Sequence, residues 1–293
     1  MRRPPAYTSK ACDVPKGSVI TSGPRRLIVG RLLGVGGLSR VYAAYYDELD
    51  SPEVAVKSSV VGEWSDEGTV ACRASLLWEG EVLSELTHPG IVHLFSFGLA
   101  KEGLAREFPF LIMELLNGES LAKRSREAGG LRAEAAVSFV LAIGDILRYL
   151  HYEAQRTPGD LKTENIFIMP DGTLKIFDLA ASVRIGGHST CSGEFFGLGT
   201  RILWGSPPYT APEQEDKAAV ITGAADVYAL ALVLGQLMAP GYYGRGNEHL
   251  VRAHPVAPDL PENVQLVIDL MTTRNPAERV ERETALRRVS ALR

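Results

Sequence analysis

The sequence predicts an α+β fold with two lobes, a small β-rich N-terminal lobe and a larger α-helical C-terminal lobe. Short β-like runs crowd the chain before residue 116, and a single helical stretch interrupts them. After Asn117-Gly118 the apolar residues recur mostly at helical spacing. The 293 residues are enough for two lobes that each bury a core.

The N-terminal lobe, 25–116, is predicted to be a five-stranded antiparallel sheet with one helix. Runs rich in β-branched and aromatic residues predict its strands, at 27–33, 40–46, 53–58, 91–98 and 108–114. The helix is expected at 72–86, because His88-Pro89-Gly90 would end it. Residues 1–24 are rich in proline, small polar residues and basic residues, without periodicity. We expect them to form a flexible tail, and the alternative is that they pack on a lobe.

The C-terminal lobe, 117–293, is predicted to be mostly helical. Apolar residues within 134–152 recur at helical spacing and define one buried face. Pro170-Asp171-Gly172 predicts a hairpin between short strands at 166–169 and 174–177. Further helices are expected near 212–215, 223–238, 261–273 and 282–292. A cleft between two such lobes is a common place for a ligand.

The composition argues against nucleic acid or a membrane as the main partner. The chain is 45% hydrophobic and 23% charged, with a net charge of −4. Its three cysteines are far apart and have no zinc-type spacing, which is typical of reduced thiols in the cytosol. No secretory signal is expected, and the most apolar segment, 227–238, is too short to span a bilayer. We therefore expect a cytoplasmic protein without a membrane anchor.

A glycine-rich segment, Gly34-Val35-Gly36-Gly37, joins the first two predicted strands. Glycines let the backbone approach phosphate oxygens closely, so this loop suits a nucleotide phosphate. A dinucleotide-binding fingerprint would instead need a strand followed by a helix. The alternative is a plain glycine-rich hairpin.

Val54-Ala55-Val56-Lys57 occupies the third predicted strand. Alternation buries the two valines and leaves Ala55 and Lys57 on the opposite face, where the lysine could reach phosphates. The alternative is an ordinary exposed strand lysine. Glu79, on the predicted helix, is the partner that we expect to fix the ammonium group of Lys57, because Glu81 points to a different face.

Four polar residues follow the long helix in an order that suits phosphoryl transfer. Asp160 could accept a hydroxyl proton, and Lys162 could stabilise the transferring phosphoryl group. Asn165 and Asp178 offer the oxygen ligands that magnesium prefers. A single aspartate could also cap a turn or helix, but four such groups in this order make that alternative weak.

Other polar residues of the C-terminal lobe are predicted to be structural. Glu213 and Arg279 could form a buried ion pair. Asp226 begins a very apolar helix and is expected to accept backbone N–H bonds from the loop of Asp160. His88 and His151 are interpreted as packing or capping residues.

From about residue 26 to 293 the chain resembles the eukaryotic-type (Hanks-type) protein kinases, especially the bacterial serine/threonine kinases. The matching motifs occur in the family's order, namely 34–41, 54–57, Glu79 with His88-Pro89, 113–116, 160–165, Asp178, 211–213, Asp226 and Arg279. The resemblance implies one bilobal kinase domain over 25–293 and a protein substrate with a Ser or Thr acceptor. It also implies ATP and magnesium (or manganese) as cofactors. Lys162, two residues after the presumed base, resembles the serine/threonine branch, and Ser206 stands where that branch has a threonine contacting the catalytic Asp and Lys.

The resemblance also assigns roles to individual residues. The catalytic group would comprise Asp160 as base with Lys162, Lys57 and Glu79, and the metal would be held by Asn165 and Asp178. ATP would bind at a hinge, 114–116. Its contacts would be Leu33, Gly34, Gly36, Gly37, Val41, Ala55, Lys57, Met113, Glu114, Leu116 and Phe167.

The chain departs from the family pattern at two motifs. The usual His-Arg-Asp is Pro158-Gly159-Asp160, and the usual Asp-Phe-Gly is Asp178-Leu179-Ala180. Without that arginine the loop cannot clamp a phosphorylated activation segment. We therefore expect activity that does not depend on phosphorylation of the segment residues Ser189, Thr190, Ser192 and Thr200. Regulation would then come from a partner protein or from the segment itself.

Three hypotheses remain after this reading. The leading one is an active serine/threonine kinase that uses ATP and magnesium. The altered 158–159 and 179–180 keep open a pseudokinase that acts as a nucleotide-binding scaffold or regulatory module. A small-molecule kinase resembling aminoglycoside phosphotransferases, which often have Gly before the catalytic Asp, is the third; Ala211-Pro212-Glu213 and the Glu213–Arg279 pairing argue against it.

Overall fold

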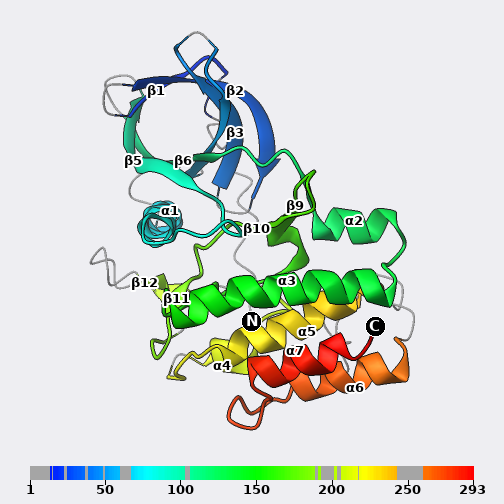
Figure 1. The fold of residues 1–293 in the computed structure, drawn as a ribbon. Coiled ribbons are helices and arrows are strands. Elements are labelled where there is room, and N and C mark those ends of the chain that lie inside the picture. Colours follow the sequence, from blue (N-terminus) through cyan, green and yellow to red (C-terminus); the bar gives the residue numbers. More distant parts are fainter. Residues whose placement is uncertain are drawn as a thin grey trace. The chain divides into compact units, whose positions relative to one another are not determined.

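The chain forms two compact units (Figure 1). The computed structural model describes residues 14, 16–22, 25–36, 39–48, 50–59, 67–102, 106–188, 191–192, 201–202, 206–216, 218–242 and 260–293. The first unit contains the described residues up to Glu85 together with Val92–Leu116. The second contains Leu86–Ile91 and most of the described residues from Asn117 onward.

The first unit is built on a six-stranded antiparallel sheet, in the order β1-β2-β3-β4-β6-β5. Its strands are β1 (Val19–Ser22), β2 (Arg25–Val35), β3 (Ser39–Tyr46), β4 (Glu53–Ser59), β5 (Leu94–Glu102) and β6 (Arg106–Glu114). The helix α1 (Glu67–Ser84) packs against β4, β5 and β6. All five predicted strands and the predicted helix are confirmed, although β5 begins three residues later than the run that predicted it.

The expected tail is wrong for its last part, because Val19–Ser22 adds a sixth strand to the sheet. It pairs with β2 from Val19 opposite Ile28 to Ser22 opposite Arg25. Val14 is buried, and its N–H donates to the hydroxyl of Tyr42 at 3.0 Å. The physical reason is that the free edge of β2 offers unpaired N–H and C=O groups, which a short polar segment can satisfy.

The core of this unit lies on one face of the sheet. Alternation along β4 places Val54 and Val56 in the main hydrophobic cluster, together with Leu27, Val29, Tyr42, Ala44, Phe110 and Ile112. Ala55 and Lys57 do not belong to that cluster, although both are buried. The predicted division of this strand into two faces is confirmed.

The second unit is mainly helical (Figure 1). Its helices are α2 (Leu121–Glu127), α3 (Ala133–Tyr152), α4 (Pro212–Glu215), α5 (Ala224–Met238), α6 (Glu262–Met271) and α7 (Arg282–Ser290). The yellow helix α5 contacts α2, α3, α6 and α7. It is buried on nearly every side, which explains why its sequence is apolar all round. Among the helices of the described ranges, none has the length and apolar character needed to cross a bilayer.

Short strands hold the loops of this unit. The predicted hairpin is confirmed as β9 (Ile166–Ile168) with β10 (Leu174–Ile176), and β7 (Glu119–Ser120) extends it. The other short pair of this unit is β8 (Arg156–Thr157) with β11 (Val183–Arg184). Elsewhere, β12 (Cys191–Ser192) pairs with β13 (Arg201–Ile202). The helix α2 was not predicted, although Ser120 caps it by accepting a hydrogen bond from Lys123 N–H at 3.2 Å.

Candidate active site

A buried ion pair joins the third predicted strand of the first unit to its helix. Nζ of Lys57, on β4, lies 2.6 Å from Oε2 of Glu79, on α1. The two side chains are only 9% and 1% exposed. A lysine buried this deeply needs a charged partner, because desolvation disfavours its ammonium form. The structure therefore brings together the two residues that the sequence paired.

The glycine loop of the first unit lies between β2 and β3. Gly36 N–H donates to the carbonyl oxygen of Ser39 at 2.9 Å, which closes the turn. A Cβ added at Gly34 would meet no atom within 4 Å. Leu33 is exposed and Val41 is half-buried near this turn. The expected contact Gly37 lies outside the described residues.

The predicted hinge begins at the end of β6. Met113 pairs with Ala55 across the sheet, and both side chains are buried. Glu114 is tied to His93 twice, because its N–H donates to the His93 carbonyl at 2.9 Å and its Oε1 accepts from His93 N–H at 2.7 Å. Leu116 is half-buried at the end of this segment. The carboxylate of Glu114 is thus engaged within its own unit.

In the second unit, a network of short hydrogen bonds holds Asp160. Lys162 Nζ lies 2.5 Å from Asp160 Oδ2 and donates to Ser206 Oγ at 2.7 Å. Asn165 Nδ2 donates to the main-chain carbonyl of Asp160 at 3.0 Å. Asp160 Oδ1 is buried and accepts no hydrogen bond from any described residue. One carboxylate oxygen is therefore fixed, and the other is left for a donor that the described part of the chain does not supply.

Asn165 and Asp178 come together through the β9–β10 hairpin. Ile166 pairs with Ile176, and Phe177 N–H donates to the carbonyl of Asn165 at 3.1 Å. Phe167 and Phe177 pack edge to face beside them, with ring centroids 5.1 Å apart. Asp178 has φ +63°, a conformation that a non-glycine residue adopts only when its surroundings impose it.

The donor set of this pair fits magnesium. An amide oxygen and a carboxylate are hard ligands, and magnesium is often held by one or two carboxylates plus phosphates and water. Asn165 donates through Nδ2 to the loop, which leaves Oδ1 as the amide atom that could bind a cation. Among the described residues no cluster of three or more His, Cys, Asp or Glu could enclose a metal by itself.

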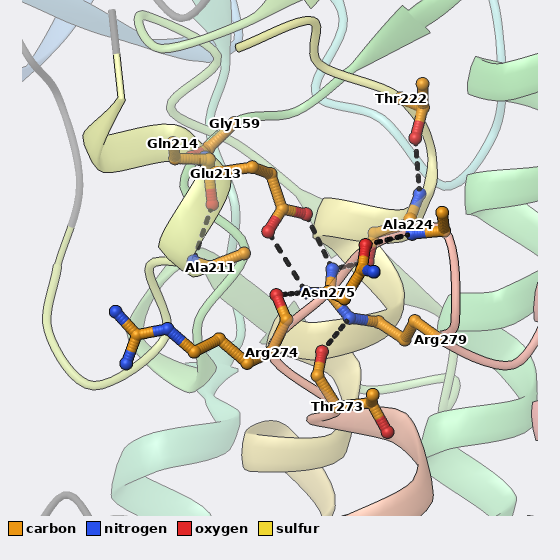
Figure 2. Close-up of polar contacts among 11 residues, drawn as sticks. Gly159, Ala211, Glu213, Gln214, Thr222, Ala224, Thr273, Arg274, Asn275 and Arg279 are labelled. Atoms are coloured by element: carbon orange, nitrogen blue, oxygen red, sulfur yellow. Dashed lines mark hydrogen bonds and ion pairs between the residues drawn. The ribbon is translucent and has the colours of Figure 1, made fainter.

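The residue before Asp160 must be glycine. Gly159 has φ +78°, and a Cβ built on it would lie 2.0 Å from the carbonyl oxygen of Ala181. Its own carbonyl accepts a hydrogen bond from Gln214 Nε2 at 2.8 Å (Figure 2). Sequence reasoning missed Gln214. The available signal was a polar residue directly after Ala211-Pro212-Glu213, on a helix that should be buried.

The predicted pair of Glu213 and Arg279 is confirmed as a buried bidentate ion pair (Figure 2). Nη1 of Arg279 lies 2.6 Å from Oε1 of Glu213, and Nη2 lies 3.0 Å from Oε2. The arginine also donates to the carbonyl oxygens of Ala224 and Thr273, at 2.7 and 3.0 Å. This pair fixes the short helix α4 to the segment between α6 and α7.

The expectation for Asp226 is wrong. Its Oδ2 lies 2.6 Å from Nε2 of His151, and this side chain, not a backbone N–H of 156–165, is its hydrogen-bond partner. Pro158 has no N–H to offer, and the packing of α3 on α5 lets the buried His151 reach the carboxylate. Burial raises the pKa of Asp226, and the hydrogen bond from His151 opposes that rise.

Comparison with known proteins decides the family. The family model described as "Protein kinase domain" matches residues 27–288. The chain belongs to the protein kinase domain family. Its bilobal α+β character and its resemblance to bacterial serine/threonine kinases are thereby confirmed.

Three relatives of this kinase domain carry the name of serine/threonine-protein kinases. PknA of Mycobacterium tuberculosis is 30% identical over 274 residues, which cover 90% of this chain and 60% of the relative. PknD of the same organism is 29% identical over 269 residues, covering 88% and 38%. PknG of Mycobacterium leprae is 28% identical over 233 residues, covering 77% and 28%. The chain thus spans about three fifths or less of the length of these relatives.

Proposed function

We propose that this kinase domain is an active protein serine/threonine kinase, which transfers the γ-phosphoryl group of ATP to a Ser or Thr hydroxyl of a protein. The observation that carries the proposal is the state of Asp160. Its Oδ2 is held by Lys162, while its buried Oδ1 has no partner among the described residues. That is the arrangement a base needs to receive the hydrogen bond of an incoming hydroxyl.

The proposed reaction assigns one task to each residue. Asp160 accepts the proton of the substrate hydroxyl while the hydroxyl oxygen forms a bond to the γ-phosphorus of ATP. The bond between that phosphorus and the β–γ bridging oxygen breaks, and ADP leaves. Lys162, bonded to both Asp160 and Ser206, offsets charge on the phosphoryl group. Lys57, oriented by Glu79, would bind ATP phosphates. Asn165 and Asp178 would hold magnesium, which neutralises phosphate charge when bound.

The remaining contacts to ATP are proposed from the family pattern. The glycine loop with Leu33, Gly34, Gly36 and Val41 would cover the phosphates, and 113–116 with Ala55 and Phe167 would contact the base. We also propose the division into lobes at 116/117. The cytoplasmic location and a regulatory partner protein stay predictions.

We further propose that activation-segment phosphorylation does not control activity in the usual way. The support is Gly159, because an arginine there would meet the backbone of Ala181. The acceptor residues Ser189, Thr190 and Thr200 lie outside the described residues, as does the side chain of Ser192. Alanine variants at these four positions should keep their activity, and loss of activity in them would refute the idea.

A pseudokinase is the second candidate, favoured by Pro158-Gly159 and Leu179-Ala180. One transfer experiment separates the candidates. The chain is incubated with magnesium, γ-labelled ATP, a mixture of unfolded proteins and an aminoglycoside, and the labelled products are identified by mass spectrometry. Label on protein Ser or Thr is the expected result. Nucleotide binding without transfer would favour the pseudokinase, and label on the aminoglycoside alone would favour a small-molecule kinase.

A further inference from the structure

Gln214 connects the helix α4 to the loop that carries Asp160 (Figure 2). Its side chain is buried, with 6% exposure. Oε1 accepts a hydrogen bond from Ala211 N–H at 2.9 Å, and Nε2 donates to the Gly159 carbonyl at 2.8 Å. The orientation of the amide follows from its partners, because a backbone N–H can only donate and a carbonyl can only accept.

Two side-chain amides thus hold the peptide groups on either side of Asp160. Gln214 binds the carbonyl of Gly159, and Asn165 binds the carbonyl of Asp160 itself at 3.0 Å. Peptide groups are planar, so fixing one on each side of a Cα atom also fixes the direction of its Cα–Cβ bond. The carboxylate of Asp160 is carried on that bond.

The residue that needs this support is Gly159. Glycine has more conformational freedom than any other residue, and this one adopts φ +78° next to Asp160. It has no side chain with which to hold the loop. A hydrogen bond to its carbonyl is therefore the direct means of restricting it.

The other end of the connection is rigid. Gln214 follows Glu213, whose carboxylate forms the buried bidentate pair with Arg279. That arginine is held in turn by the carbonyls of Ala224 and Thr273. A donor mounted on so constrained a helix can fix a carbonyl within tenths of an ångström, which a mobile side chain cannot.

We propose that Gln214 is a positioning residue for Asp160, and that it orients the carboxylate for the incoming hydroxyl through the Gly159 carbonyl. The proposal rests on the function proposed above. It does not give Gln214 any contact with substrate. Substitution of Gln214 should therefore slow the transfer step and leave the binding of ATP unchanged.

Two substitutions isolate the connection. In Gln214→Glu the shape and the bond from Ala211 N–H are kept, but a carboxylate oxygen faces the Gly159 carbonyl. In Gln214→Met the length is kept and both hydrogen bonds are lost. We expect kcat to fall by about ten- to a hundredfold in both variants, with the KM for ATP unchanged.

Gln265 provides the matched control for a purely structural effect. It is a buried glutamine of α6, and it bonds the hydroxyl of Tyr242 and the carboxylate of Asp269, at 2.9 and 2.7 Å. We expect both Gln265→Met and Gln214→Met to lower the urea midpoint of unfolding. Gln265→Met should leave kcat unchanged. Equal effects of the two variants on kcat would overturn the proposal.

Hydrogen exchange at 156–165 gives a second readout that does not need activity. Gln214→Glu should speed exchange in this loop, and Gln265→Met should not. If hydrogen exchange at 156–165 is unchanged in Gln214→Glu, the positioning role is overturned. This readout holds even if the protein shows no catalytic activity. If wild-type transfer is abolished by Asp160→Asn but not slowed by Gln214→Glu, the proposed function stands and the positioning role fails.

Discussion

Lys57 and Glu79 form a buried ion pair, with Nζ and Oε2 separated by 2.6 Å. Glu79→Ala would remove the carboxylate that lies against the buried ammonium of Lys57, at a cost of about 3–5 kcal/mol of unfolding free energy. We expect a lower urea midpoint and the loss of most phosphoryl transfer. Glu81→Ala is the matched control, because Glu81 lies on the same helix and is more exposed. Similar losses in the two variants would contradict the role of the pair.

Restoring the family's usual arginine should harm this protein. Gly159→Arg would force φ +78° on a residue with a Cβ and drive that atom into the Ala181 carbonyl. We expect it to be less active and less stable than wild type, as measured by transfer rate and thermal unfolding. Gly172→Arg shares the positive φ of +85° but meets no atom within 4 Å, so it should cost only about 1–2 kcal/mol. A gain of activity in Gly159→Arg would contradict the geometry.

The Glu213–Arg279 pair should show strong coupling in a double-mutant cycle. Glu213→Gln or Arg279→Met alone leaves one buried charge, and each should cost about 3–5 kcal/mol. The double variant removes both charges, so it should cost less than the sum of the two single variants. Denaturant unfolding measures all four proteins. Additive losses would mean that the two side chains do not interact.

The sheet and the main helices could be predicted because local pattern determines them. Period-2 alternation marked β4, and helical spacing marked α3. The strand β1 was not predicted, because Val19–Ser22 is short and is stabilised by pairing with β2. Local β-propensity gives no information about such pairing. The helix α2 was not predicted either, although Ser120 is a common type of N-cap residue.

In the candidate site, too, some residues could be predicted from the sequence and some contacts could not. Lys57, Glu79, Asp160 and Asn165 could be proposed from the sequence because their order and spacing suit phosphoryl transfer. The sequence can single out Gln214 as a polar residue of a buried helix, but it cannot give the partner of that side chain. Gly159 lies 55 positions away, and only the fold brings the two residues together. The error at Asp226 has a similar cause, because its bond to His151 depends on how α3 packs against α5.

His88 should make stability depend on pH. Burial lowers its pKa, and its Nδ1 accepts a hydrogen bond from Gly90 N–H at 2.9 Å, which requires the neutral ring. The unfolded chain then binds the proton more readily than the folded chain. The contribution of His88 is present above about pH 6.5 and is lost as the pH falls through and below that value.

His88→Asn keeps an acceptor near the position of Nδ1 but does not titrate. Its urea midpoint should fall less steeply than that of wild type between about pH 6.5 and 5. If the urea midpoint depended on pH equally in His88→Asn and in wild type, His88 would not be the source of the pH dependence.

Asp160→Asn tests the central claim most directly, because it keeps the size of the side chain and removes its capacity to accept a proton. The measurement is the rate of label transfer from ATP to protein Ser or Thr, with and without magnesium. Asp171→Asn, at an exposed hairpin aspartate, is the matched control. We expect magnesium-dependent transfer in wild type and in the control, and a loss of about a hundredfold or more in Asp160→Asn. Transfer that Asp160→Asn leaves intact would contradict the assignment of Asp160 as the base.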